Sequence, residues 1–92
     1  MSLKCLQEAM KLAYYDRDEE RGVHATFTWL VEEVGELAEA LLNGDKRRVG
    51  EEVADIIAWT LSIANLMGVD ALEHFKEKYA EDLKRAGCLS KS

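Results

Sequence analysis

Four acidic residues form two pairs with the same spacing: Glu33 with Glu36, and Glu52 with Asp55. Residues three apart lie on one face of a helix, so each pair would place two carboxylates side by side. Carboxylates held this close repel each other, and partial burial adds a desolvation cost, so their charge must be compensated. Protons, Lys or Arg partners, or a divalent cation would each do so. No His or Cys joins the group, and all-oxygen sites favour Mg²⁺, with Mn²⁺ close behind, over Zn²⁺ or copper.

The acids lie within a chain that glycines divide into four predicted helices, with no proline in the sequence. Apolar residues at helical spacing predict these helices over about residues 3–20, 26–42, 46–67 and 71–86, with a connection at 21–25. Asn43-Gly44 supplies a helix stop and Asp45 an N-cap for the third helix. Short connections favour antiparallel neighbours. We therefore expect an all-α protomer that resembles a four-helix antiparallel bundle.

Helical periodicity places both acidic pairs at the edge of an apolar arc. Glu33 and Glu36 share a stripe with Trp29, and Glu52 and Asp55 share one with Trp59. The arc beside the first pair comprises Phe27, Leu30, Val31, Val34, Leu37, Ala38, Leu41 and Leu42. Glutamates three apart are also common on solvated helices, because Glu is a good helix former. Periodicity alone leaves a metal site and an ordinary solvated face equally open.

Length and composition limit the classes of protein to consider. Ninety-two residues predict one domain over 1–92, too short for a lone monomer to be more than marginally stable. A net charge of -6 argues against sequence-independent binding to nucleic acid, although a bound metal can still attract a phosphate substrate to an acidic site. No apolar run has the roughly 18 residues needed to span a bilayer, so we expect a cytoplasmic protein that does not enter a membrane. We expect Cys5 and Cys88 to be reduced.

The acidic segments resemble a known family. Glu32-Glu33-Val34-Gly35-Glu36, followed by Glu52-Val53-Ala54-Asp55, is similar to the EExxE…ExxD signature of MazG-like nucleotide pyrophosphohydrolases. The resemblance covers roughly residues 27–85. It implies an enzyme that hydrolyses nucleoside triphosphates, often deoxy or non-standard ones, to a monophosphate and pyrophosphate. It also implies a homodimer or homotetramer and a role in cleaning the nucleotide pool.

The resemblance assigns roles to individual residues. Glu33, Glu36, Glu52 and Asp55 match the acids that bind Mg²⁺ and carry catalysis, while Glu32 matches a leading acid of less uniform role. A third segment, in which the family uses Lys, Asn and Arg around the phosphates, matches Lys78, Asp82 and Arg85. Asp82 replaces the usual Asn, so Lys78 and Arg85 are the expected phosphate contacts.

Both tryptophans are candidate contacts for the base of the substrate, because a base needs an apolar or stacking surface. Trp29 and Trp59 lie in the acidic stripes, and Phe27 and His24 are weaker candidates; packing in a core is the commoner role for such residues. Two other functions stay open. One is a relative of phosphoribosyl-ATP pyrophosphohydrolase, whose second motif usually continues into a Tyr-His pair where this chain has Trp59-Thr60. The other is a non-enzymatic helical dimerisation module.

Overall fold

The computed structural model describes residues 1–89, and within that range every regular element is a helix. The expectation of an all-α protein is confirmed. The five helices are α1 (Leu3–Arg21), α2 (Val23–Leu42), α3 (Lys46–Leu66), α4 (Ala71–Lys78) and α5 (Ala80–Arg85). Taken singly, no described helix has the length and apolar character to cross a bilayer, and α3 with α4 would qualify only as a pair bent by 105°.

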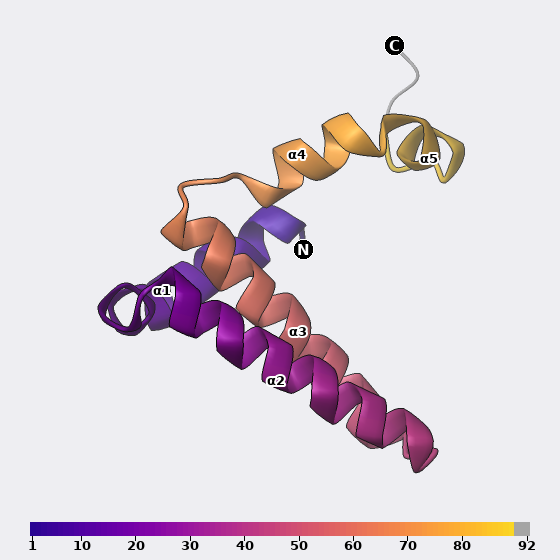
Figure 1. Cartoon of the computed structure of the whole chain (residues 1–92). Coiled ribbons are helices and arrows are strands. Elements are labelled where there is room, and N and C mark those ends of the chain that lie inside the picture. Colours follow the sequence, from indigo (N-terminus) through magenta and orange to yellow (C-terminus); the bar gives the residue numbers. More distant parts are fainter. Residues whose placement is uncertain (90–92) are drawn as a thin grey trace.

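The long antiparallel hairpin of α2 and α3 is the main structural unit (Figure 1). The chain reverses at Gly44, whose φ of +65° is a left-handed value that glycine adopts without a steric penalty. Asp45 then caps α3 by accepting a hydrogen bond from the backbone N–H of Arg48 at 3.2 Å. The predicted stop and cap are therefore confirmed, and they place the two acidic segments on facing helices.

The connection between α1 and α2 is shorter than predicted. It consists of Gly22 alone, with φ +92°, and α2 already begins at Val23 where the sequence indicated Thr26. The carbonyl of Gly22 accepts a hydrogen bond from the Thr26 hydroxyl at 2.8 Å, and Thr26 is fully buried. One glycine is sufficient because its positive φ turns the chain sharply without further linking residues.

Gln7 joins α1 to the link between α3 and α4. Its side-chain amide N–H donates to the carbonyl of Val69 at 2.7 Å and to the side chain of Asn65 at 3.1 Å. Its side-chain oxygen accepts from the backbone N–H of Ala71 at 3.0 Å, and Asn65 donates back to the Gln7 carbonyl at 3.1 Å. These bonds fix the crossing of α1 over α3 and the start of α4.

The last predicted helix is divided at Tyr79. This residue leaves helical geometry, with φ -114° and ψ 29°, although hydrogen bonds continue on both sides of it. The break has no sequence signal, because neither proline nor glycine stands there. The α4–α5 arm extends away from the hairpin (Figure 1), with α4 packed on α1 and α5 on α4. A four-helix bundle within one chain is therefore not confirmed.

The described chain has a small core and a large exposed apolar surface. Ala40 and Leu61 are its only apolar residues classed as buried, whereas Phe27, Val31 and Val34 of α2 are each about half exposed. The radius of gyration is 15.0 Å, compared with about 12 Å for a compact domain of this length. Cys5 and Cys88 are both free. The single chain is extended, and it leaves uncovered much of the surface that normally forms a core.

Gln7→Ala should lower the free energy of unfolding by roughly 1–3 kcal/mol, because it leaves partly buried polar groups without their partners. Urea denaturation followed by circular dichroism measures the change. Glu8→Ala, at an exposed neighbouring position, is the matched control. Equal stability of the two variants would contradict the role of Gln7 as the joint between α1, α3 and α4.

Candidate functional site

Three of the four predicted metal ligands meet across the α2–α3 hairpin. Glu33 from α2 and Glu52 and Asp55 from α3 each offer a carboxylate oxygen, and these three oxygens lie within 4.8 Å of one another. The hairpin brings them together because an antiparallel pair of helices places residues at equal distances from the turn opposite each other. These three residues are called the acidic triad below.

The proximity of the acids raises the pKa of Glu33 to about 7 from its ordinary value of 4.5. The largest cause is the neighbouring carboxylate of Glu52, to which only a protonated Glu33 can donate a hydrogen bond, followed by desolvation and by the negative charges of Glu52 and Asp55. Without a cation, the acidic triad therefore holds a proton near neutral pH. A divalent ion would replace that proton and remove the repulsion between the carboxylates.

The donor set fits a hard divalent ion. Oε2 of Glu52 is shielded from solvent and has no hydrogen-bond partner among the described residues. A shielded oxygen without a donor is costly, and coordination to a cation would satisfy it. All three donors are carboxylate oxygens, the ligand type that Mg²⁺ and Mn²⁺ prefer. The triad therefore offers the ligand type of a magnesium site, together with a shielded oxygen that a bound cation would satisfy.

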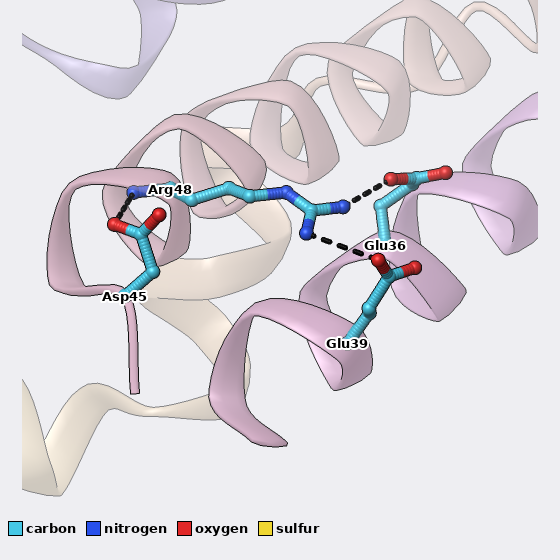
Figure 2. Close-up of polar contacts among 4 residues, drawn as sticks. All are labelled: Glu36, Glu39, Asp45 and Arg48. Atoms are coloured by element: carbon cyan, nitrogen blue, oxygen red, sulfur yellow. Dashed lines mark hydrogen bonds and ion pairs between the residues drawn. The ribbon is translucent and has the colours of Figure 1, made fainter. Parts of the chain in front are cut away.

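Glu36, the fourth predicted ligand, lies outside the acidic triad and pairs instead with Arg48, as Figure 2 shows. Its Oε2 accepts a hydrogen bond from Nη2 of Arg48 at 2.6 Å, and Nη1 of the same guanidinium donates to Glu39 at 3.3 Å. Arg48 is in the first turn of α3, near the link, and reaches Glu36 across the hairpin. The structure thus neutralises Glu36 with an arginine while it leaves the triad without a cationic partner among the described residues.

Arg48 was not singled out from the sequence, although a signal was present. Arg48 precedes Glu52 by four residues, so helical spacing puts it in the same stripe as Glu52 and Asp55. An arginine in that stripe, one turn closer to the hairpin link, is placed to meet an acid of the facing helix. Its two carboxylate partners raise the pKa of Arg48, chiefly through the hydrogen bond to Glu36. The guanidinium is charged at every relevant pH.

The two tryptophans of the acidic stripes meet one turn beyond the triad. The rings of Trp29 and Trp59 are stacked, with centroids 6.3 Å apart and planes 10° from parallel. The guanidinium of Arg21, at the end of α1, lies 5.1 Å from the ring centroid of Trp59. Trp29 is 44% exposed and Trp59 is half-buried. The pair therefore forms an aromatic wall that is open to solvent beside the carboxylates.

A cavity of about 260 Å³ lies between α1 and α3 next to this wall. It contains a buried ion pair: Asp18, only 3% exposed, accepts a hydrogen bond from Nη1 of Arg21 at 3.0 Å. Its lining residues are Met10, Tyr14, Arg17, Asp18, Arg21, Asp55, Ala58, Trp59 and Ser62. Neither Asp18 nor Arg21 was predicted from the sequence to have a role. Their opposite charges three residues apart at a helix end were the available signal, but the cavity depends on how α1 crosses α3.

The expected phosphate contacts lie elsewhere in the chain. Lys78 ends α4 and Arg85 ends α5, both are exposed, and the arm that carries them leads away from the hairpin (Figure 1). The ammonium of Lys78 is 5.7 Å from the ring centroid of Tyr79. Within one chain the structure does not bring these residues to the acidic triad. Glu32 is exposed, as its outward position on the helix indicated, and Asp82 is exposed too.

The described residues form an all-helical fold in which one helical hairpin brings together three carboxylates, an arrangement that suits a divalent ion. Residues 21–82, well over half of this chain, match the family model of the MazG nucleotide pyrophosphohydrolase domain. The chain therefore belongs to the MazG family, as its two acidic motifs indicated. Members typically depend on a divalent metal, and membership indicates nucleotide pyrophosphohydrolase activity. A comparison with curated proteins gave no match.

The raised pKa of Glu33 predicts how stability depends on pH. The folded state binds a proton more tightly than the unfolded state, so stability without metal should fall as the pH rises from about 4.5 through about 7. Glu33→Gln should remove most of this fall, because the amide mimics the protonated acid. Thermal unfolding without metal at about pH 5 and about pH 8 measures the effect. At the higher pH, Mg²⁺ should stabilise the natural chain and not the variant.

Glu32→Gln is the matched control, since Glu32 is the exposed neighbour of Glu33 and lies outside the acidic triad. It should retain both the pH-dependent fall and the stabilisation by Mg²⁺. Identical pH profiles for Glu33→Gln and the natural chain would show that the three carboxylates do not share a proton.

Proposed function

We propose that this protein is a Mg²⁺-dependent nucleotide pyrophosphohydrolase that converts (deoxy)nucleoside triphosphates to monophosphates and pyrophosphate, in a role that cleans the nucleotide pool. The observation that carries the proposal is the acidic triad with its unpartnered Glu52 oxygen, in a chain of the MazG family. Mn²⁺ is the alternative ion.

Glu33, Glu52 and Asp55 would hold the ion, each through one carboxylate oxygen. When bound, a divalent ion supplies positive charge for the phosphates and favours the ionised form of a nearby water. The second oxygen of Glu33, which the ion would leave uncoordinated, would then be placed to accept a proton from that water. The three carboxylates would thus orient both the phosphates and the attacking water.

Glu36 is the fourth acid that we propose for metal binding and catalysis, but its side chain would have to leave Arg48 first. Its carboxylate would reach the ion only by exchanging the 2.6 Å contact with Arg48 for coordination. The freed guanidinium of Arg48 would then supply a positive charge, and such a charge would assist the departure of pyrophosphate. Lys78 and Arg85 stay proposals as phosphate contacts, and Trp29 and Trp59 as contacts for the base.

We also propose that a second copy of this chain covers the exposed apolar face of the hairpin. This face is formed by Phe27, Val31, Val34 and Leu41 of α2 with Val53 and Ile57 of α3, all more than 40% exposed. It extends along both helices, so two copies related by a twofold axis would bury it in a bundle of four helices. The occupant must be present whenever the chain folds, because the single chain has almost no core of its own. A second copy meets that condition, as a dimer or as half of a tetramer.

Pyrophosphate release from each common (d)NTP, measured with and without Mg²⁺, tests the activity. Glu52→Gln should lower kcat/KM on the order of a hundredfold, because it removes a charged ligand from the triad. Glu51→Gln changes the adjacent exposed acid, which pairs with Arg47, and should leave activity near that of the natural chain. A protein that releases no pyrophosphate from any nucleotide and does not respond to Mg²⁺ would instead be a helical dimerisation module.

Val34→Lys should shift the natural oligomer towards monomer, because it places two desolvated charges in the proposed interface. Analytical ultracentrifugation over a range of protein concentrations measures the dissociation. Leu12→Lys is the matched control, since Leu12 is an apolar residue of α1 that is 87% exposed and outside the hairpin face. A natural chain that sediments as a monomer at all concentrations would refute the proposed interface.

A further inference from the structure

The cavity between α1 and α3 adjoins the acidic triad. Asp55 belongs to the triad and also lines the cavity, and Trp59, one turn further along α3, lines the cavity and stacks on Trp29. A molecule with its phosphates at the triad would therefore have this cavity within reach of its other end. The volume of about 260 Å³ is close to the lower limit for small-molecule pockets.

The Asp18–Arg21 pair gives the cavity a fixed donor beside a fixed acceptor. Asp18 is 3% exposed, and only its Oδ1 takes part in the 3.0 Å ion pair, so Oδ2 can still accept a hydrogen bond from a bound molecule. The Arg21 side chain is 26% exposed, and a guanidinium has five N–H donors, of which the ion pair uses one. Burying such a pair is costly unless further hydrogen bonds satisfy it. A ligand that presents a donor next to an acceptor would supply these bonds.

Aromatic rings next to the pair suit a planar ligand. The guanidinium of Arg21 lies 5.1 Å from the centroid of Trp59, and the guanidinium of Arg17 lies 5.5 Å from the centroid of Tyr14. Aromatic rings and guanidinium planes are the surfaces on which proteins stack bases. The cavity thus combines stacking surfaces with one hydrogen-bond acceptor, Asp18, and one donor, Arg21, side by side.

We propose that this cavity binds the base of the nucleotide substrate and selects bases in which an exocyclic amine stands next to a ring nitrogen acceptor, as in cytosine and adenine. Asp18 accepts a hydrogen bond from the amine, and Arg21 donates one to the ring nitrogen. Uracil and hypoxanthine reverse this pattern, with a carbonyl towards the carboxylate and a ring N–H towards the guanidinium. The inference rests on the proposed pyrophosphohydrolase function and adds to it a specificity that none of the predicted site residues provides.

The test uses pairs of substrates that differ only in the group that Asp18 meets. These are dCTP against dUTP, and dATP against dITP, assayed for pyrophosphate release by the full-length oligomer with Mg²⁺. The natural chain should favour the amine-bearing member of each pair by about tenfold or more in kcat/KM, because the other member leaves buried polar groups unpaired. Asp18→Asn should lower that ratio about tenfold, since an amide can donate to the carbonyl. Asp16→Asn, the same change at an exposed position of α1, should keep the natural ratio.

Titration with nucleoside monophosphates, followed by NMR, tests base selection by the cavity even if Asp18→Asn does not fold. In the natural chain without metal, dCMP should shift the NMR signals of the Trp59 indole N–H and the Arg21 guanidinium, and dUMP should bind about tenfold more weakly. Ala58→Leu, which fills the cavity from α3, should abolish these shifts, whereas Ala13→Leu on exposed α1 should not.

The outcomes separate the two proposals. Hydrolysis with equal kcat/KM for both members of each pair would overturn the base selection and leave the pyrophosphohydrolase function standing. No hydrolysis of any nucleotide would refute the function, and the dCMP titration would then still decide the cavity. Shifts confined to α4 and α5, or equal affinity for dCMP and dUMP, would overturn the inference.

Discussion

The mutual repulsion of Glu33, Glu52 and Asp55 is the constraint on which the rest of the structure depends. These carboxylates lie where the two long helices face each other, a place that apolar side chains usually fill. The hairpin therefore gains little from apolar burial at its centre, and Ala40 and Leu61 are the only apolar residues classed as buried in the described chain. Near neutral pH the acids avoid full charge by holding a proton on Glu33, and a divalent ion would end the repulsion. The small apolar core and the uncompensated negative charge of the hairpin therefore have the same origin, which is the placement of carboxylates between α2 and α3.

The acidic interior of the hairpin also explains why its apolar side chains face outward. Helical periodicity correctly separated the acidic stripe from the apolar arc and put Trp29 and Trp59 in the acidic stripes, but it did not predict that their rings stack. It could not say which side faces the neighbouring helix, because an amphipathic pattern does not identify the partner of each face. The usual assumption places the arc inside, yet Phe27, Val31 and Val34 are each about half exposed. The sequence thus predicts the helices and their faces, whereas the packing of α2 on α3 decides which face is left exposed.

Other features could not be predicted because they depend on contacts between distant segments. The ends of the hairpin helices follow from Gly44 and Asp45, whose conformational preferences act locally. The break at Tyr79 has no such local cause and appears where the chain leaves α1. Arg48 shares the stripe of Glu52 and Asp55, but only the geometry of the hairpin shows that it pairs with Glu36, which lies outside the acidic triad. The four acids of the sequence motifs are equivalent in spacing and unequal in environment.

Helix α3 connects the two halves of the candidate site. Asp55 belongs to the acidic triad and lines the cavity, while Trp59 lines the cavity and stacks on Trp29, so successive turns of one helix would serve the proposed phosphate and base ends of the substrate. The cavity exists because α1 crosses α3 at an angle fixed by Gln7 and by the sharp turn at Gly22. A shift of α1 would alter the base pocket and leave the carboxylates in place, since both helices of the triad belong to the hairpin. In the proposed enzyme, changes in α1 would therefore alter specificity for the base, while the three carboxylates that would hold the ion stay fixed by α2 and α3.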